Sequence, residues 1–236
     1  MTKVLIVNAD DFGRSRGINR GIVCAHDDGV VTSASAMVCW SAAEEAAALA
    51  RDRPWLGVGL HVDLGEWVWD GGKWRAAYER SLADRAAVSA EVTRQLARFR
   101  ELFGADPTHL DSHQHVHREE PARSIIVELG RSLEVPVRDN TPGLTYRGDF
   151  YGQTGHGDPL PETITVDALL RLLASLSNGV TEIGCHPAAE AEVSSRYAAE
   201  RVEELRVLCD SRIRAAVAAE EIELRSFRAT LASVRE

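Results

Sequence analysis

Short apolar runs alternate along the chain with longer stretches whose apolar residues recur at helical spacing. The segment from Val4 to Val7 is a compact β-branched run that ends at small and polar residues, which predicts a buried strand. Apolar or alternating segments predict further strands over residues 33–38, 57–64, 108–115, 181–185 and 222–227. Residues 135–138 predict a short extended piece of the same kind.

Helices are expected between these strands, over residues 16–28, 84–103, 166–176 and 197–219 and after Pro121. A further helix is expected to begin at Ser41, because Glu44 follows three residues later at the spacing of a capping box, and to end before Pro54. Gly104 is expected to cap the C-terminal end of the 84–103 helix. Two Gly-bearing segments, 65–75 and 140–165, are expected to be loops.

The alternation of strands and helices predicts a parallel sheet. About seven such units favour a (β/α) barrel, which could be distorted or incomplete, over an open doubly wound sheet. The chain contains no internal repeat and no linker that divides it. We therefore expect residues 1–236 to form a single α/β domain.

Charge and composition limit the choice of partner and compartment. The net charge is -9 and no run of Lys or Arg occurs, so we expect no nucleic-acid partner. The four cysteines have neither C-x-x-C nor zinc-finger spacing, which favours free thiols in a reducing compartment. The apolar run at the N-terminus is too short for a signal peptide, and no stretch could span a membrane. A cytoplasmic location is the expectation.

Polar residues capable of metal binding or acid–base chemistry lie where several predicted strands end. Active sites of parallel α/β folds form at the carboxyl ends of their strands. The residues at these positions are Asp10, Asp11, His61, Asp111, His113, Arg138 and His186. Random placement would scatter them between both ends of the sheet, so we expect them to converge on one face.

The adjacent carboxylates Asp10 and Asp11 point in different directions if the chain is extended there, so one can bind a metal while the other faces substrate. An isolated Asp-Asp pair could instead cap the following helix. His61 stands in an apolar strand, where a lone histidine is more often a hydrogen-bonded core residue. The density of histidines in a later segment favours metal binding.

That later segment contains His113, His115 and His117, which would share one face of an extended chain. Such density is uncommon outside metal or proton-transfer sites. The spacing alone leaves open which of the three binds. A carboxylate with two imidazoles suits zinc or another divalent transition metal, and magnesium or manganese less naturally.

Three further residues have candidate roles and structural alternatives. Asp111 could orient an imidazole, or bond local backbone at the strand end. His186 could be a general acid that protonates a leaving nitrogen, or a structural histidine. Arg138 could hold a catalytic carboxylate in its ionised form, or form a surface salt bridge.

Trp67, Trp69 and Trp74 cluster in the 65–75 segment. Indole faces could form a platform for a sugar, and the alternative is a hydrophobic cluster that anchors the loop. Apolar residues such as Trp67 and Trp69 could also serve the interface of a homodimer.

Four motifs, in this order, resemble those of the YdjC-like carbohydrate deacetylases, a family that includes enzymes acting on chito-oligosaccharides and a hopanoid-associated branch. The resemblance extends from residue 4 to about residue 187. The motifs are Asn8-Ala9-Asp10-Asp11-Phe12-Gly13, Gly59-Leu60-His61, Thr108-His109-Leu110-Asp111-Ser112-His113-Gln114-His115-Val116-His117 and Cys185-His186-Pro187.

The resemblance implies a (β/α) barrel related to polysaccharide deacetylases. It implies one divalent metal held by Asp11, His61 and His113, with Asp10 as general base and His186 as candidate general acid. Magnesium is often assigned to this family, zinc would suit the same ligands, and manganese or cobalt are further candidates.

We therefore expect a metal-dependent hydrolase that removes N-acetyl groups from a small acetylated amino sugar and releases acetate, with Trp67, Trp69, His115 and His117 as substrate contacts. Rival hypotheses are hydrolysis of a phosphoester or of another ester or amide, and a sugar-binding protein without catalysis. A glycosidase that uses Asp10 and Asp111 as its paired carboxylates is a further rival.

Overall fold

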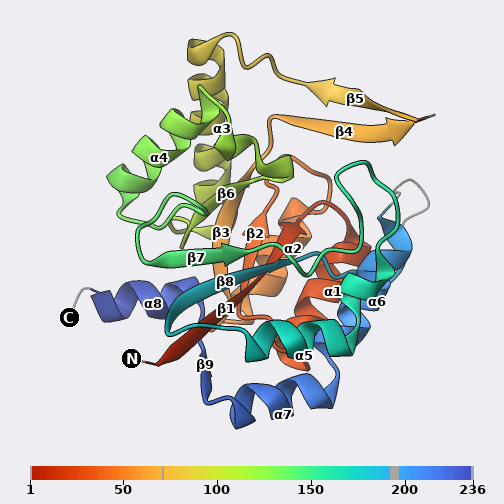
Figure 1. Cartoon of the computed structure of the whole chain (residues 1–236). Coiled ribbons are helices and arrows are strands. Elements are labelled where there is room, and N and C mark those ends of the chain that lie inside the picture. The colour runs from red at the N-terminus through yellow and green to blue at the C-terminus, as the bar shows by residue number, and fades with distance from the viewer. Residues whose placement is uncertain (1, 71, 192–196, 235–236) are drawn as a thin grey trace.

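The computed structural model describes residues 2–70, 72–191 and 197–234. A curled parallel sheet has the strand order β6-β3-β2-β1-β8-β7, and β9 pairs with the beginning of β1 (Figure 1). Its strands are β1 (Lys3–Phe12), β2 (Ser33–Ala36), β3 (Gly57–Val62), β6 (Leu110–Ser112), β7 (Leu144–Arg147), β8 (Gly179–Cys185) and β9 (Ile222–Leu224). Within the described residues β6 and β7 do not pair, so the expected (β/α) barrel is confirmed in its incomplete form.

Helices surround the outer side of this curled sheet (Figure 1). They are α1 (Arg16–Asp27), α2 (Ala43–Arg51), α3 (Arg85–Phe103), α4 (Ala122–Leu133), α5 (Val166–Ala174), α6 (Ala198–Leu208), α7 (Ser211–Ala219) and α8 (Phe227–Val234), with short 3₁₀ turns η1 (His113–Arg118) and η2 (Pro161–Ile164). Ser15 accepts a hydrogen bond from the backbone N–H of Ile18 and so caps α1. Gly104 ends α3 in the left-handed conformation, as predicted. None of the described helices is both long and apolar enough to cross a bilayer.

Strand β1 is the centre of the sheet and fixes the location of the site. Its residues Leu5, Ile6 and Val7 are almost completely buried, because strands line it on both edges and helices cover it. Parallel pairing with β2 and β8 places the carboxyl ends of all three strands at the same edge. The side chains that follow these strands therefore meet there.

The 65–75 segment is not a loop, contrary to expectation. It belongs to an antiparallel hairpin of β4 (Gly65–Asp70) and β5 (Lys73–Glu79), which extends away from the main sheet in Figure 1. Its Trp and Val residues favour strands, and Gly72, at φ +87°, supplies the left-handed residue of the connection.

Other boundaries also differ from the predictions. The 140–165 segment contains β7 and η2, and the expected 197–219 helix is two helices because Asp210 caps a new one. The expected strand over 108–115 ends at Ser112 and turns into η1. The helix predicted from Ser41 begins at Ala43. Its N-cap residue is Ala42, which forms no side-chain hydrogen bond to the helix.

Candidate metal and catalytic site

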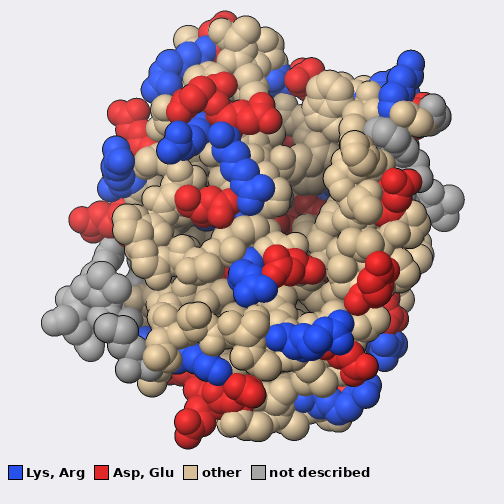
Figure 2. Space-filling model, in the orientation of Figure 1, with Lys and Arg blue, Asp and Glu red and all other residues tan. Residues whose placement is uncertain are grey.

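A cavity of about 800 Å³ lies at the carboxyl ends of β1, β3, β6 and β8. Hairpin β4–β5, the turn η1 and the segment from Tyr146 to Gly157 supply much of its wall. Figure 2 shows a hollow below the hairpin in this region. The side chains expected to converge at the strand ends therefore share one accessible space.

Asp10 and Asp11 both line this cavity although they are neighbours in one strand. A regular strand would point them to opposite faces. Asp11 has a φ of +70°, and the register between β1 and β2 shifts between Ala9 and Phe12. This irregularity turns both carboxylates toward the site, and Asp tolerates the left-handed conformation better than most residues.

Three buried residues form a compact set of potential metal ligands: Asp11, His61 and His113. Asp11 Oδ1 lies 3.6 Å from His61 Nε2 and 3.2 Å from His113 Nδ1. The same oxygen is buried and has no hydrogen-bond partner among the described residues. A buried carboxylate oxygen without a donor is costly, which a cation at this point would relieve.

Hydrogen bonds on the opposite ring nitrogens leave both histidines ready for a cation. Nδ1 of His61 lies 2.7 Å from Asp111 Oδ1, and Nε2 of His113 lies 2.9 Å from Glu66 Oε2. With a cation beside Asp11, the nitrogens that face it would be deprotonated, and the ring proton of each histidine would be on the nitrogen that faces Asp111 or Glu66, whose carboxylate accepts it. The neutral rings then present their lone pairs toward Asp11, and the donor set fits a divalent cation.

Without a cation, a proton takes its place at His113. Burial alone would lower the pKa of this imidazole, but the nearby carboxylates of Asp11 and Glu66 outweigh burial and raise the pKa to about 9. Burial alone would lower the pKa of His61, but Asp111, Asp10 and Asp11 together outweigh burial and raise it.

Asp10 is held by a buried arginine. Arg138 Nη1 and Nη2 donate to the two oxygens of Asp10 at 2.7 and 2.8 Å. Burial alone would raise the pKa of Asp10, but the Arg138 guanidinium outweighs it and the pKa is lowered. The carboxylate therefore stays ionised at neutral pH. The surface alternative for Arg138 is excluded, because only 1% of its side chain is exposed.

A second compact acidic group contains Asp10, His61 and Asp111. Its oxygens already accept from Arg138 and from Nδ1 of His61. This arrangement satisfies the two carboxylates internally, so Asp10 and Asp111 form a hydrogen-bonded support next to His61, which is shared with the metal-ligand set.

His186 also lies beside Asp10. Its Nε2 is 3.8 Å from Asp10 Oδ2, and its Nδ1 is 3.8 Å from Glu204 Oε1. Burial lowers the pKa of His186 to about 4, so the resting imidazole is neutral. Glu204 accepts hydrogen bonds from the backbone N–H of His186 and from the hydroxyl of Tyr197, which fixes the position of the carboxylate beside the imidazole.

The three histidines of η1 do not share one face, contrary to the prediction. Gln114 and His115 have φ values of +50° and +55°, so the extended chain is broken directly after His113. His113 and His115 line the cavity. His117 is fully buried behind it, with its Nδ1 2.6 Å from Ser112 Oγ.

Only part of the predicted tryptophan cluster is placed at the cavity. Trp67 lines the cavity, and Trp74, the third tryptophan of the cluster, lines it as well. The backbone of Trp69 lies in β4, and its side chain is outside the described part of the chain.

Sequence reasoning missed several charged residues of the site. Arg201, on α6, is buried and pairs with Asp11 Oδ2, and Glu204 lies one turn further along the same helix. Arg14 and Glu66 meet at 3.0 Å beside His113. No signal in the sequence separates these residues from ordinary charged surface positions, because each stands in a segment that carries other charges.

Relatives of known sequence match almost the whole chain. A family model described as YdjC-like protein matches residues 4–219. A carbohydrate deacetylase from Geobacillus stearothermophilus is 36% identical over 250 residues, which cover 97% of this chain and 98% of that protein. A chitooligosaccharide deacetylase from Salmonella typhimurium is 35% identical over 255 residues, covering 92% and 95%.

Solved structures agree with these matches. A protein from Enterococcus faecalis V583, provisionally described as a cellobiose-phosphate cleavage protein, superposes with a TM-score of 0.78 at 25% identity, covering 98% of this chain and 99% of that one. A family 4 carbohydrate esterase from Streptomyces lividans shares the fold, with a TM-score of 0.55 at 14% identity over 94% of this chain and 91% of that one. The chain belongs to the YdjC-like family.

Proposed function

We propose that this chain hydrolyses the acetamide of an acetylated amino sugar or short oligosaccharide and releases acetate. Its relatives are named carbohydrate deacetylase and chitooligosaccharide deacetylase, which supports a hydrolytic deacetylase. The observation that carries the proposal is the ionised Asp10 carboxylate, held by Arg138 beside the donor set of Asp11, His61 and His113. A base next to a cation site is what hydrolysis of an unreactive amide requires.

A divalent cation at Asp11, His61 and His113 would polarise the acetyl carbonyl and lower the pKa of a nearby water molecule. Asp10 accepts the proton that this water loses as its oxygen bonds to the carbonyl carbon. Arg138 keeps Asp10 ionised and holds it in one orientation.

His186 supplies the proton to the departing amine when the C–N bond breaks. The resting imidazole is neutral, so it must gain a proton during turnover. Asp10 holds the proton of the water at that stage and lies 3.8 Å from His186 Nε2. Transfer from Asp10 through His186 to the amine balances the reaction, and the products are acetate and a free amino sugar.

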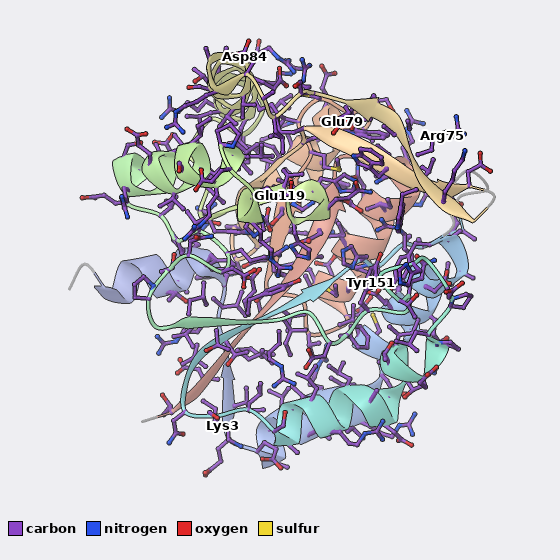
Figure 3. The ribbon with its side chains drawn as sticks, turned by 45° about the horizontal axis from the view of Figure 1, so that its top comes forward. Lys3, Arg75, Glu79, Asp84, Glu119 and Tyr151 are labelled. Atoms are coloured by element: carbon purple, nitrogen blue, oxygen red, sulfur yellow. The ribbon has the colours of Figure 1, made fainter. Side chains whose placement is uncertain are left out.

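Aromatic side chains around the cavity support a sugar substrate. Trp67 and Trp74 are exposed by 38% and 42% and both line the cavity, and indole rings are suited to contact the apolar face of a sugar. Tyr151 and His115 also contribute to its wall. Figure 3 shows Tyr151 on the segment that faces hairpin β4–β5, where Arg75 is labelled. A cavity of about 800 Å³ accommodates a ligand of short-oligosaccharide size.

The proposal extends to the metal, the domain and the compartment. Two imidazoles and one carboxylate favour zinc, with magnesium the main alternative and manganese or cobalt as further candidates. One domain over residues 1–236 and a cytoplasmic location complete it. The free thiols of all four cysteines support a reducing compartment.

A substrate screen tests this function against its rivals. The metal-supplemented protein is incubated with N-acetylated sugars, with sugar phosphates and with glycosides, and acetate, phosphate and shortened sugars are each assayed. We expect acetate alone. Phosphate release would indicate a phosphoesterase, shortened sugars a glycosidase, and no product from any substrate a sugar-binding protein.

A further inference from the structure

Glu66 belongs to hairpin β4–β5 and yet contacts a residue of the proposed cation site. Its Oε2 lies 2.9 Å from His113 Nε2 and 3.0 Å from Arg14 Nη1. Only 13% of the Glu66 side chain is exposed. Strands β1 and β3 and the turn η1 thus supply the ligands, whereas a separate two-stranded sheet supplies an acidic partner of one of them.

The contact fixes the tautomer that His113 adopts when a cation is bound. A cation beside Asp11 needs the lone pair of Nδ1, which lies 3.2 Å from Asp11 Oδ1, so the one remaining ring proton is on Nε2, where the Glu66 carboxylate accepts it. His61 is held in the same way by Asp111, with the two nitrogens exchanged. Each histidine therefore has a carboxylate on its far nitrogen, an arrangement that orients metal-binding imidazoles.

The hairpin is fixed against His113 by further hydrogen bonds. The backbone N–H of Trp67 donates to Gln114 Oε1 at 3.0 Å, and Gln114 Nε2 donates to the Trp67 carbonyl at 2.9 Å. These two residues follow Glu66 and His113 directly in the chain. The hydrogen bonds between Trp67 and Gln114 therefore hold the neighbouring Glu66–His113 contact in place.

Arg14 supports the negative charge of Glu66. Its Nη1 lies 3.4 Å from His113 Nε2, which is longer than its 3.0 Å contact with Glu66. Its guanidinium also lies over the Trp40 ring, 4.7 Å from the centroid. Arg14 thus compensates the charge of Glu66 directly beside the imidazole.

We propose that Glu66 is a positioning residue of the cation site, which holds His113 in the tautomer and orientation that leave Nδ1 free for a divalent cation. The proposal rests on the cation site of the proposed function. Because Glu66 belongs to hairpin β4–β5, tight cation binding then requires the hairpin to be packed against η1 as it is here.

The test is calorimetric titration of Zn²⁺ into metal-stripped full-length protein. We expect Glu66→Ala to weaken zinc affinity about 10- to 100-fold. Glu66→Gln keeps an acceptor oxygen but not the charge, so its zinc affinity should lie between those of Glu66→Ala and wild type. Glu79→Gln is the matched control, because Glu79 is an exposed acid of the same hairpin (Figure 3). It should bind zinc as wild type does.

Thermal unfolding of the metal-stripped variants separates positioning from stability. Unchanged zinc affinity in Glu66→Ala and Glu66→Gln, whatever their Tm, would overturn the proposal, as would an equal loss in Glu79→Gln. If Glu66→Ala does not fold, the zinc affinity of the near-isosteric Glu66→Gln variant decides: an affinity equal to that of wild type overturns the proposal. Asp11→Ala tests the cation site itself. If this variant binds zinc with the same affinity as wild type, the proposed cation site is wrong, and so is this inference.

Discussion

Arg138 forms two parallel hydrogen bonds with Asp10, of 2.7 and 2.8 Å, at the centre of the site. The same guanidinium lies 2.7 Å from Glu182 and 2.8 Å from Asp111. One buried cation therefore contacts three buried acidic side chains, and its own pKa is raised well above the usual range because their attraction outweighs burial. The orientation of the proposed base and the stability of the barrel both depend on this residue.

Replacement of Arg138 by Ala should lower both Tm and turnover. Removing one partner of a buried ion pair leaves uncompensated charge and costs about 3–5 kcal/mol. Thermal unfolding measures the loss, and Arg206→Ala, on the exposed part of α6, is the control with an expected Tm near wild type. Equal Tm values for wild type and Arg138→Ala would contradict the compensating role.

Asp10→Asn should abolish acetate release while the protein still binds metal. The amide keeps the shape of the side chain but cannot accept the proton of the attacking water at neutral pH. Turnover and zinc titration on the same preparation check both parts. A rate near that of wild type would show that Asp10 is not the base.

Zinc binding should release at least one proton per ion at pH 7. The pKa of His113 in the metal-free protein is raised to about 9, so this imidazole carries a proton at pH 7 that the cation must displace. Apparent affinity should therefore rise with pH by at least about tenfold per unit and level off above about pH 9. Calorimetry in buffers of different ionisation enthalpy counts the protons, and a count of zero at pH 7 would refute the expected protonation of His113.

Trp67→Ala and Trp74→Ala should each raise KM several-fold with a smaller effect on kcat. Both indoles line the cavity and neither belongs to the proposed base or ligands, so they would contribute to binding the substrate rather than to the chemical step. Trp55→Ala is the control, because Trp55 is 82% exposed and does not line the cavity. Unchanged KM in both variants would remove the tryptophans from the substrate site.

The main features of the site could be predicted because they follow from strand direction. Asp10, Asp11, His61 and His113 each lie where a strand ends, and parallel pairing brings such positions together wherever the intervening helices run. The (β/α) organisation could be predicted for the same reason, since the alternation of strand and helix is a local property of the sequence.

The remaining parts depend on contacts that no local pattern records. The left-handed residues Gln114 and His115 carry no glycine signal, so the break after His113 looks like a continued strand. Arg201 and Glu66 are charged residues in segments rich in charge, and only the packing of α6 and of the hairpin brings them to the ligands.

Acetate release from N-acetylglucosamine oligomers by metal-stripped protein, with Zn²⁺, Mg²⁺, Mn²⁺ or Co²⁺ added back in turn, tests the central claim most directly. We predict no release from the stripped protein, restored release with a divalent cation, and no restoration in Asp11→Ala. Release that continues undiminished after stripping would contradict the metal-dependent account. Lack of release with every cation, in protein shown to bind zinc, would contradict the proposed substrate.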